Sequence, residues 1–598
     1  MLSQSTADNG ASFWPNAFNS PIYSGRITHN GGVSLSFPLF STIACTTKVL
    51  NMSRRDDTLW KRKELTRRSM GFVFIAWMVT TVQCCAPDGR PNVLLIIVDD
   101  LRPTLGIYGD RLAITPAIDS LANNGIVFAN AHAQQALCAP SRTSFLTSRR
   151  PDSLHLYGTG PYWRTHAGNF TTIPQYFKGH GYHTVSVGKV FHPGPISGHT
   201  DDYPFSWSQE PYHPSSLRFE NTKVCPDPDG TLENNLLCAV NVTSQPEGTL
   251  PDIQSTAYAS AFLRRWAKRS SGGPDGRFFL AVGFHKPHIP FRIPAKYLSM
   301  YPLSNISLAP DPTLPSGLPS VAWNPWMDLR RRRDVAALNI SFPYGPMPVP
   351  FQKAVRQQYY AAVSYIDDQV GQLLQVLEET RLRDDTLIVL MGDHGWSLGE
   401  HQEWAKYSNY QVATRTPLIV SFPPCDEGRV PRVNPVPEPV MLLDLFPTMA
   451  IASRLPAPRP CSAIPIAGDK FTCTEGRNLL AAASSITPLG SRREILTQYP
   501  RPSVQPRWDS DQPKEDAIQI MGYSMLSMEY RYTEWIKFNG STYEKDWGVC
   551  YARELYDLQA DGMEDHNVAG LSHYAGLVER LSQRLKYIVG DLFKNGYS

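Results

Sequence analysis

The chain has 598 residues, a formal net charge of +3 and 19% charged residues. This length is enough for one large domain and a smaller one, and the near-neutral charge argues against a strongly basic nucleic-acid-binding protein. The composition also argues against a chain that is disordered throughout, and no internal repeat, zinc-finger pattern or GxGxxG pattern occurs.

The N-terminal part differs from the rest of the chain. Residues 1–69 are rich in Ser, Thr and Asn, which predicts a disordered extension or an over-extended start. Residues 70–86 contain an apolar stretch behind a basic pair, of signal-peptide length and too short to span a bilayer comfortably. A signal peptide begins near the start of a protein, so the pattern favours Met52 or Met70 as initiator. The alternative is a signal-anchor; otherwise no stable membrane span is expected.

Two further features are typical of a secreted or luminal glycoprotein. Acceptor triplets for N-glycosylation occur at Asn169, Asn241, Asn305, Asn339 and Asn539. Among ten cysteines, Cys225 and Cys238 lie close in sequence, as do Cys461 and Cys473, so each pair predicts a local disulfide in an oxidising compartment. Cys138 has no near partner.

From residue 91 onward, helical and strand patterns alternate, which predicts the α/β class. Continuous aliphatic runs such as 91–98 are typical of strands buried on both faces, so we expect a large, mostly parallel central sheet flanked by helices. The expected strands are 91–98, 125–129, 182–187, 277–283, 385–391 and 418–422, and the expected helices are 115–124, 173–178, 252–269, 351–381 and 441–450.

The last hundred residues predict a second unit. Composition loosens between 456 and 491, after which shorter strands are expected at 494–497, 517–521, 530–536 and 554–557, with a helix at 574–589. This pattern suggests a smaller C-terminal α+β domain, 490–598, with an antiparallel sheet. The catalytic domain would then span 88–480.

Acidic residues follow two of the predicted buried strands. Asp99 and Asp100 end the first, and Asp393 with His394 ends the strand at 385–391. Ligands of open α/β sheets gather at the carboxyl ends of strands. Three carboxylates suit Ca²⁺ or Mg²⁺, whereas imidazole is a less usual partner for Ca²⁺. One such pair alone would be a helix cap or a solvated turn; two around one cysteine loop favour a metal site.

That cysteine loop is Cys138-Ala-Pro-Ser-Arg142. Alone, the motif equally suits a buried thiol in a loop-to-helix turn. Cationic and proton-carrying side chains stand in nearby loops, at Lys189, His192, Lys286, His288 and Lys406. Each alone would be a surface or core group, but together around a metal they suit the transfer of a negatively charged group, by neutralising its oxygens and protonating the leaving alcohol.

These residues together resemble the type I sulfatases of the alkaline-phosphatase-like superfamily. The resemblance covers residue 91 to the end, and longer stretches at 285–292, 323–328, 395–409 and 498–502 strengthen it. It implies that the formylglycine-generating enzyme oxidises Cys138 to Cα-formylglycine, whose hydrated aldehyde is the nucleophile. It also implies one Ca²⁺ per chain, held by Asp99, Asp100, Asp393, His394 and residue 138 itself.

The resemblance further implies roles for the basic residues. Arg142 and Lys189 would hold the aldehyde hydrate, and His192 would act as base. His288 and Lys406 would bind the sulfate, with His288 as the acid for the leaving oxygen. Two departures from the family occur: Ser148 stands where the family has glycine, and one extra residue separates Lys189 from His192.

The activity implied is that of a lysosomal exosulfatase, reached by the secretory pathway, whose substrate is a sulfated glycosaminoglycan: the 2-sulfate of terminal iduronate in heparan and dermatan sulfate. The alternatives are another glycan sulfatase, a phosphodiesterase, or an inactive homologue that binds sulfated glycans. A phosphodiesterase would carry Thr or Ser in place of Cys138. Intact Asp99, Asp100, Cys138 and Asp393 argue against the inactive homologue.

Overall fold

The computed structural model describes residues 89–227, 229–269, 276–424, 435–461, 471–480 and 494–590. The extension and signal peptide expected at 1–69 and 70–86 lie outside these ranges. The described residues all belong to one compact unit, Thr81–Ser598. Among them, no helix combines the length and the apolar character that crossing a membrane requires.

A seven-stranded sheet forms the centre, in the order β13-β2-β12-β9-β1-β7-β3. Its strands are β1 (Asn92–Val98), β2 (Ile126–His132), β3 (Tyr182–Gly188), β7 (Arg277–Phe284), β9 (Thr386–Gly392), β12 (Arg415–Ser421) and β13 (Val436–Met441). Only β12 runs antiparallel to its neighbours. The expected mostly parallel sheet is therefore confirmed. Strand β13 was not predicted, because its two prolines are compatible only with the edge position that it occupies.

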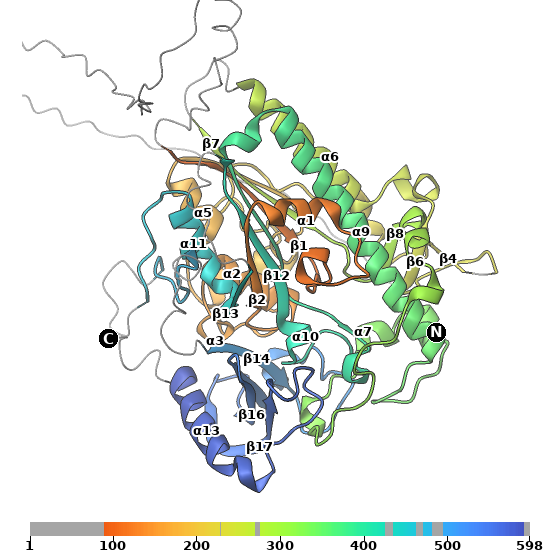
Figure 1. Ribbon diagram of the computed structural model, residues 1–598. Helices are drawn as coiled ribbons and strands as arrows, with labels where there is room; N and C mark the ends of the chain where they lie inside the picture. The colour runs from red at the N-terminus through yellow and green to blue at the C-terminus, as the bar shows by residue number, and fades with distance from the viewer. Residues whose placement is uncertain are drawn as a thin grey trace, which may run out of the picture. The chain divides into compact units, whose positions relative to one another are not determined.

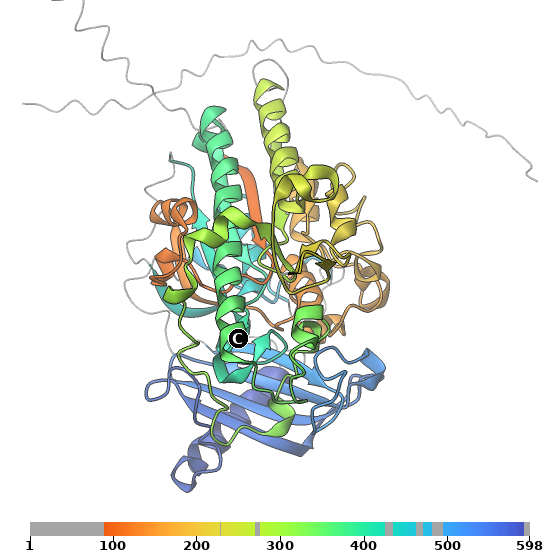
Figure 2. The ribbon, with the colours of Figure 1, turned by 90° about the vertical axis from the view of Figure 1, so that its right-hand side faces the viewer.

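Helices cover both faces of this sheet (Figure 1). One face packs against α1 (Pro116–Asn123), α6 (Pro251–Arg269) and α9 (Val349–Glu379), and the other against α2 (Cys138–Thr147), α5 (Ile173–Gly179) and α11 (Leu445–Ala452). Figure 2 shows the two long helices α6 and α9 side by side. Shorter helices are α3 (Pro151–Leu154), α4 (Trp163–His166), α7 (Met327–Arg330), α8 (Arg333–Ala336) and α10 (Gln411–Thr414).

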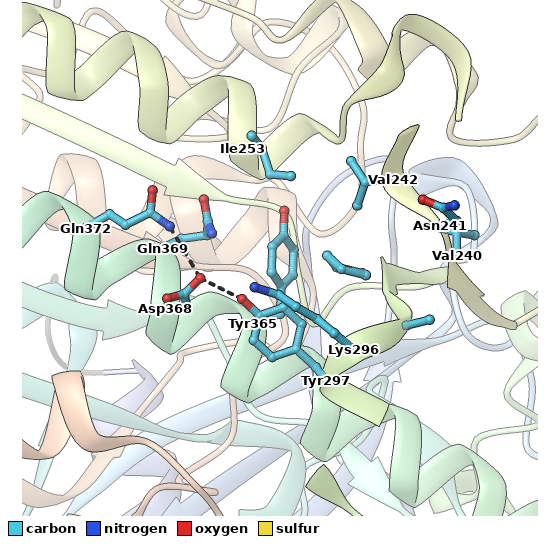
Figure 3. Close-up of a pocket in the computed structure, with 12 residues that line it drawn as sticks. Val240, Asn241, Val242, Ile253, Lys296, Tyr297, Tyr365, Asp368, Gln369 and Gln372 are labelled. Carbon is cyan, nitrogen blue, oxygen red and sulfur yellow. Dashed lines mark hydrogen bonds between the residues drawn. The ribbon is translucent and has the colours of Figure 1, made fainter. Parts of the chain in front are cut away.

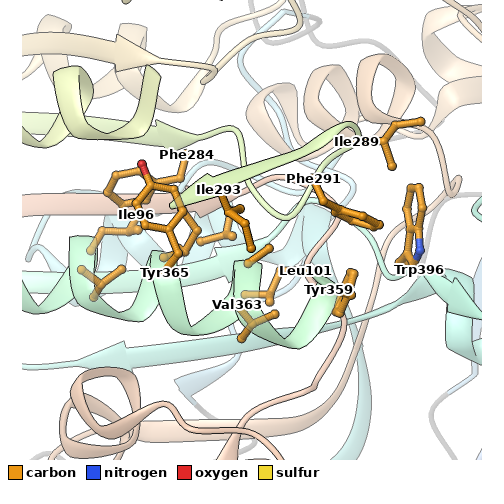
Figure 4. Close-up of a cluster of buried hydrophobic side chains, with 14 of the residues drawn as sticks. Ile96, Leu101, Phe284, Ile289, Phe291, Ile293, Tyr359, Val363, Tyr365 and Trp396 are labelled. Carbon is orange, nitrogen blue, oxygen red and sulfur yellow. The ribbon is translucent and has the colours of Figure 1, made fainter. Parts of the chain in front are cut away.

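Strand β1 shows why its sequence is continuously apolar. All seven residues are buried. Since successive side chains of a strand point to opposite faces, Leu94, Ile96 and Val98 join the cluster on the α6 and α9 side, while Val93, Leu95 and Ile97 join the other. Figure 4 shows Ile96 in the first of these clusters, near Phe284 of β7 and Tyr365 of α9.

The C-terminal residues form the expected antiparallel sheet with a last helix. Strands β14 (Ile495–Arg501), β15 (Ile520–Leu526), β16 (Tyr530–Phe538) and β17 (Lys545–Asp557) pair in chain order, and α13 (Ala575–Gly590) packs on them. Two-stranded pairs are β4 (Cys225–Pro226) with β5 (Leu232–Glu233), β6 (Leu237–Val240) with β8 (Phe291–Pro294), and β10 (Ser397–Leu398) with β11 (Trp404–Ala405). The domain boundary expected near 480–490 stays a prediction.

Both expected disulfides are present. Cys225 bonds Cys238, and Cys461 bonds Cys473. Within the described ranges, Cys138 and Cys550 carry free thiols. The cysteine with no near partner in the sequence is therefore unpaired here, as its predicted chemical role requires.

Candidate active site

The predicted residues gather at the carboxyl ends of four neighbouring parallel strands. Strands β9, β1, β7 and β3 lie in this order, and Val98 is paired with Gly392 at the ends of β1 and β9. Asp99 therefore starts beside Asp393, each just beyond its strand. Lys189 follows β3 in the same way. The position of these side chains follows from parallel pairing alone.

Gly188, which precedes Lys189, lets the neighbouring strands approach closely. Its φ is +72°, and a Cβ there would lie 2.2 Å from the backbone oxygen of Gly283 on β7. No side chain fits this space, so glycine is required for the turn that directs Lys189 into the site.

Cys138 begins α2 at this edge, and its side chain is buried. The Sγ atom lies 3.0 Å from Lys406 Nζ, 3.4 Å from His394 Nε2, and 3.9 Å from both Asp100 Oδ1 and Lys189 Nζ. Two cations, a carboxylate and an imidazole thus surround the thiol. A group that carries oxygen atoms at this position could accept hydrogen bonds from Lys406, Lys189 and His394.

Arg142 stands one turn further along α2 and ties the acidic strand ends together. Its Nη2 donates to Asp99 Oδ1 at 3.1 Å, and its Nε to Asp393 Oδ2 at 3.0 Å. Lys189 forms an ion pair with the other oxygen of Asp99. The carboxylates and the guanidinium are fully buried. Removing one partner would leave a buried charge unpaired, which is strongly destabilising.

Asp100 has the conformation of a constrained site residue. Its φ is +60°, in the left-handed region. Its N–H donates to Asp393 Oδ1 at 3.0 Å, its carbonyl accepts from Tyr359 Oη at 2.7 Å, and its Oδ1 pairs with Lys406 Nζ at 2.7 Å. Its Oδ2 is buried and has no hydrogen-bond partner among the described residues. A carboxylate oxygen that is to bind a cation would have this environment.

The donor set also fits a divalent cation. Ligand atoms of Asp99, Asp100, Cys138 and His394 lie within 4.8 Å of one another. Nδ1 of His394 lies 2.9 Å from the carbonyl of its neighbour, Gly395 O, to which it donates, so Nε2 is the ring nitrogen that faces the thiol. Metal-binding histidines are commonly oriented in this way. Asp393 stands beside this group, with its oxygens accepting from Arg142 and backbone N–H groups.

The two adjacent aspartates differ in charge state. Burial would raise the pKa of Asp99, but Lys189 and Arg142 outweigh it and hold the pKa well below its usual range. For Asp100, burial outweighs Lys406 and raises the pKa to about 8. Asp99 is thus already satisfied by protein cations, whereas Asp100 is the carboxylate that a bound cation would stabilise most.

With all three carboxylates ionised, as a bound cation would hold them, the formal charges of six side chains at the site balance. Asp99, Asp100 and Asp393 then face Arg142, Lys189 and Lys406. A bound divalent cation would therefore give the site a net positive charge. Such a site attracts an anionic ester and stabilises negative charge that develops on it.

His192 and His288 lie within electrostatic range of this group, but no hydrogen bond joins either to Cys138 in the part of the chain described. Burial, assisted by Lys189 and Arg142, lowers the pKa of His192 to about 3. Burial and Lys189 also hold the pKa of His288 well below its usual range. Both imidazoles are therefore neutral near pH 7, and the side chain of His288 is 23% exposed.

Ser148, which replaces the family's glycine, ends α2 with φ +52°. The serine is accommodated because its hydroxyl donates to Leu443 O at 2.6 Å and accepts from Gly476 N at 3.2 Å. The side chain thus offsets the cost of a left-handed backbone, which would otherwise favour glycine.

Replacing Ser148 by alanine is expected to destabilise the fold by about 1–3 kcal/mol, because the buried Leu443 carbonyl would lose its donor while the left-handed strain remains. Ser148→Gly should cost less, since it also relieves that strain. Denaturant unfolding of the two variants measures the difference. Equal stability of Ser148→Ala and wild type would show that the hydroxyl contributes nothing.

A second cluster of ligand-type side chains is better described as an ion pair. His401 Nε2 lies 2.9 Å from Asp311 Oδ2 and 2.7 Å from Met563 O, with Asp565 at 4.0 Å. A carbonyl only accepts, so Nε2 carries a proton and has no lone pair for a metal. Although burial opposes it, Asp311 raises the pKa of His401 to about 9.

A pocket of about 490 Å³ lies elsewhere, between α6, α9 and the segment after β8 (Figure 3). Tyr297 donates to Asp368 at its wall, and the glycosylation acceptor Asn241 lies at its edge. None of the predicted catalytic or metal-binding residues lines it. It is therefore separate from the candidate active site.

Two buried residues near Lys406 received no role from the sequence. Asn324 donates to Lys406 O at 2.5 Å, and Arg501 donates to Tyr407 O at 2.7 Å. Both belong to stretches that carried the family resemblance, 323–328 and 498–502. Their residue types suggest no chemistry, so only the geometry shows what they contact.

Comparisons with known proteins agree with this site. Residues 91–453 match the family model described as Sulfatase. Iduronate 2-sulfatase of Homo sapiens is 52% identical over 519 residues, which cover 82% of this chain and 93% of that protein. Iduronate 2-sulfatase of Mus musculus is 50% identical over 522 residues, with the same coverage, 82% and 93%. The crystal structure of a phosphonate monoester hydrolase of Agrobacterium radiobacter has a TM-score of 0.60 at 21% identity, covering 84% of this chain and 96% of that one, a likeness of fold alone.

Proposed function

Because the chain belongs to the sulfatase family and is a sulfuric ester hydrolase, we propose that it removes the 2-sulfate of terminal iduronate in heparan and dermatan sulfate. The main support for this proposal comes from the comparison with two iduronate 2-sulfatases. About half of the aligned positions are identical, and the alignments cover 93% of the length of each relative. An alignment that spans nearly the whole relative also covers its loops, where binding residues are most often placed.

The nucleophile in this proposal derives from Cys138. When converted to formylglycine, residue 138 supplies an aldehyde hydrate whose hydroxyl attacks sulfur. The buried thiol stands at the position of that hydrate, so its neighbours are the groups that would orient it. Lys406 at 3.0 Å and Lys189 at 3.9 Å would donate to its oxygens. Arg142 would act through Asp99 and Lys189, which it holds in place.

One divalent cation, proposed to be Ca²⁺, would be held by Asp99, Asp100, Asp393, His394 and residue 138, and would polarise the ester oxygens. The unpartnered Oδ2 of Asp100 and the position of His394 Nε2, 3.4 Å from Asp100 Oδ1, support this donor set. Lys406 would bind a sulfate oxygen while remaining paired with Asp100 Oδ1. Such fixed charges cost no reorganisation during the reaction.

The two histidines would move protons at opposite ends of the ester. His192 is neutral and has an unpartnered, buried Nδ1, which suits a base. The lowered pKa of His288 keeps its imidazole neutral, but a bound sulfate ester would raise this pKa by adding negative charge nearby. Its partial exposure suits contact with the leaving sugar, so we assign it the acid role.

The proposed location is the lysosome, reached by the secretory pathway. All five acceptor asparagines of the N-glycosylation triplets are exposed. The two disulfides are compatible with an oxidising compartment. Formylglycine formation would take place on the same route, by the modifying enzyme of the endoplasmic reticulum. No nucleic acid partner is proposed.

The substrate assignment predicts a preference among disaccharides that carry one sulfate each. Terminal iduronate 2-sulfate is expected to be cleaved at least about 100-fold faster, as kcat/KM, than glucosamine 6-sulfate, because a site built for one sulfate position leaves polar groups unpaired with another. Released sulfate is measured for each. Faster cleavage of a different ester would point to another glycan sulfatase. Binding without any sulfate release would point to an inactive, glycan-binding homologue.

A further inference from the structure

We propose that Arg501, from β14 of the C-terminal sheet, is a positioning residue that fixes Lys406 in the active site together with Asn324. The inference rests on the proposed function only in taking Lys406 as a group that binds the sulfate ester. It assigns the C-terminal sheet a part in forming the site, in addition to packing.

Arg501 uses its whole guanidinium on backbone carbonyls. The group is buried, with 1% of the residue exposed. Its five N–H groups donate to five carbonyl oxygens at 2.7–3.2 Å, those of Val321, Ala322, Tyr407, Pro500 and Ser510. No carboxylate pairs with it within the described part of the chain. A buried guanidinium without a counter-ion is costly, so its role lies in the fixed geometry of these donors.

The acceptors belong to separate segments that meet at Lys406. Val321 and Ala322 are neighbours in the short 3-10 helix before α7. Pro500 lies in β14 and Ser510 in the loop that follows it, and Tyr407 directly follows Lys406. Asn324 holds the preceding carbonyl, donating from Nδ2 to Lys406 O at 2.5 Å. The two peptide groups that flank Tyr407 are therefore anchored by two different side chains, Asn324 and Arg501.

The anchored segment would not keep this shape by itself. Ala405 and Tyr407, on either side of Lys406, have φ of +66° and +79°, in the left-handed region. Each such residue costs of order 1–3 kcal/mol and persists only where its surroundings hold it. The hydrogen bonds from Arg501 and Asn324 are those surroundings. Without them, the segment is expected to relax toward ordinary backbone angles.

Relaxation would move Lys406 relative to the nucleophile position. Tyr407 N donates to Ala136 O at 3.2 Å, two residues before Cys138, so the same segment is joined to the cysteine loop. Lys406 Nζ lies 3.0 Å from Cys138 Sγ and 2.7 Å from Asp100 Oδ1. A shift of about 1 Å can cost 100-fold in rate when a group must be pre-oriented.

The test is a double-mutant cycle between Arg501 and Lys406. Arg501→Gln is expected to lower kcat about 10–100-fold in the wild-type background, but less than about 3-fold once Lys406→Ala is present, because the group that Arg501 positions is then missing. Arg501→Lys keeps the charge but has three donors, so it should rescue only part of the loss. Rates are normalised to the fraction of residue 138 converted, measured by mass spectrometry.

Arg531→Lys is the matched control, since Arg531 is equally buried in the same sheet but pairs with Glu564 and Glu554 and contacts neither Lys406 nor Tyr407. It should leave kcat within about 3-fold of wild type. If Arg501→Gln does not fold, Asn324→Ser takes its place in the double-mutant cycle with Lys406→Ala, because Asn324 anchors the carbonyl of Lys406 itself. Losses that multiply in the double variant would overturn the proposal.

The cycle does not depend on the sugar. If the protein cleaves a simple aryl sulfate but not iduronate 2-sulfate, the substrate assignment fails and the cycle is run on the aryl sulfate. Inorganic sulfate gives a readout without turnover: its stabilising shift of the melting temperature should shrink equally in Arg501→Gln, in Lys406→Ala and in the double variant. An unchanged shift in Arg501→Gln would also overturn the proposal.

Discussion

Replacing Cys138 by alanine or serine is expected to reduce sulfate release by roughly 10⁴-fold or more, the scale seen when a covalent nucleophile is removed. Neither residue can be converted to formylglycine by the chemistry that acts on a thiol. The surrounding charges stay paired, since Lys406 also contacts Asp100 and Lys189 also contacts Asp99. The variants should therefore fold, and circular dichroism and thermal unfolding check this.

The matching prediction concerns the modification of residue 138 in the wild-type protein. Mass spectrometry of the peptide that contains residue 138 should show the aldehyde in place of the thiol. Cys550→Ser is the control, because Cys550 is the other free cysteine among the described residues and lies in the C-terminal sheet. It should retain full turnover. A fully active protein with an unmodified Cys138, or an active Cys138→Ser variant, would contradict the nucleophile assignment.

Much of this site follows from sequence because parallel strands bring their ends together. Asp99, Asp393 and Lys189 are far apart in the chain, yet each directly follows a strand, and β9, β1, β7 and β3 are neighbours. Apolar runs identify such strands, and the residue after each run is then a site candidate. The carboxyl ends of parallel strands lie on the same side of a sheet in any strand order, so the order did not need to be known.

What the sequence could not give is the set of residues that act through backbone atoms. Arg501 and Asn324 contact carbonyl groups, and no pattern of side-chain types identifies which carbonyls a buried guanidinium will meet. Ser148 shows the same limit. In the sequence, Ser148 is only a departure from the family's glycine, whereas the structure shows two hydrogen bonds that offset the cost of its left-handed backbone.

Removing divalent cations by chelation is expected to abolish turnover and to lower thermal stability. Asp100 Oδ2 is buried without a partner, so the folded protein gains stability from a cation that binds it. A cation present at 1,000 times its dissociation constant would contribute about 4 kcal/mol. Melting curves with and without the metal give this effect independently of turnover. Adding back Ca²⁺ or Mg²⁺ separately identifies the ion.

Asp100→Asn tests the same site without chelation. Asparagine tolerates the left-handed φ of +60° at this position, so the backbone should be retained. Turnover should fall by about 10²-fold or more, because losing even a hydrogen-bond partner of a metal ligand costs about 10–100-fold, and added Ca²⁺ should no longer raise the melting temperature. Asp311→Asn, which alters a buried carboxylate paired with His401 instead, should keep the response to Ca²⁺. If Asp100→Asn responds to Ca²⁺ like wild type, the cation does not bind at the strand ends. It would then not supply the positive charge on which sulfate binding here depends.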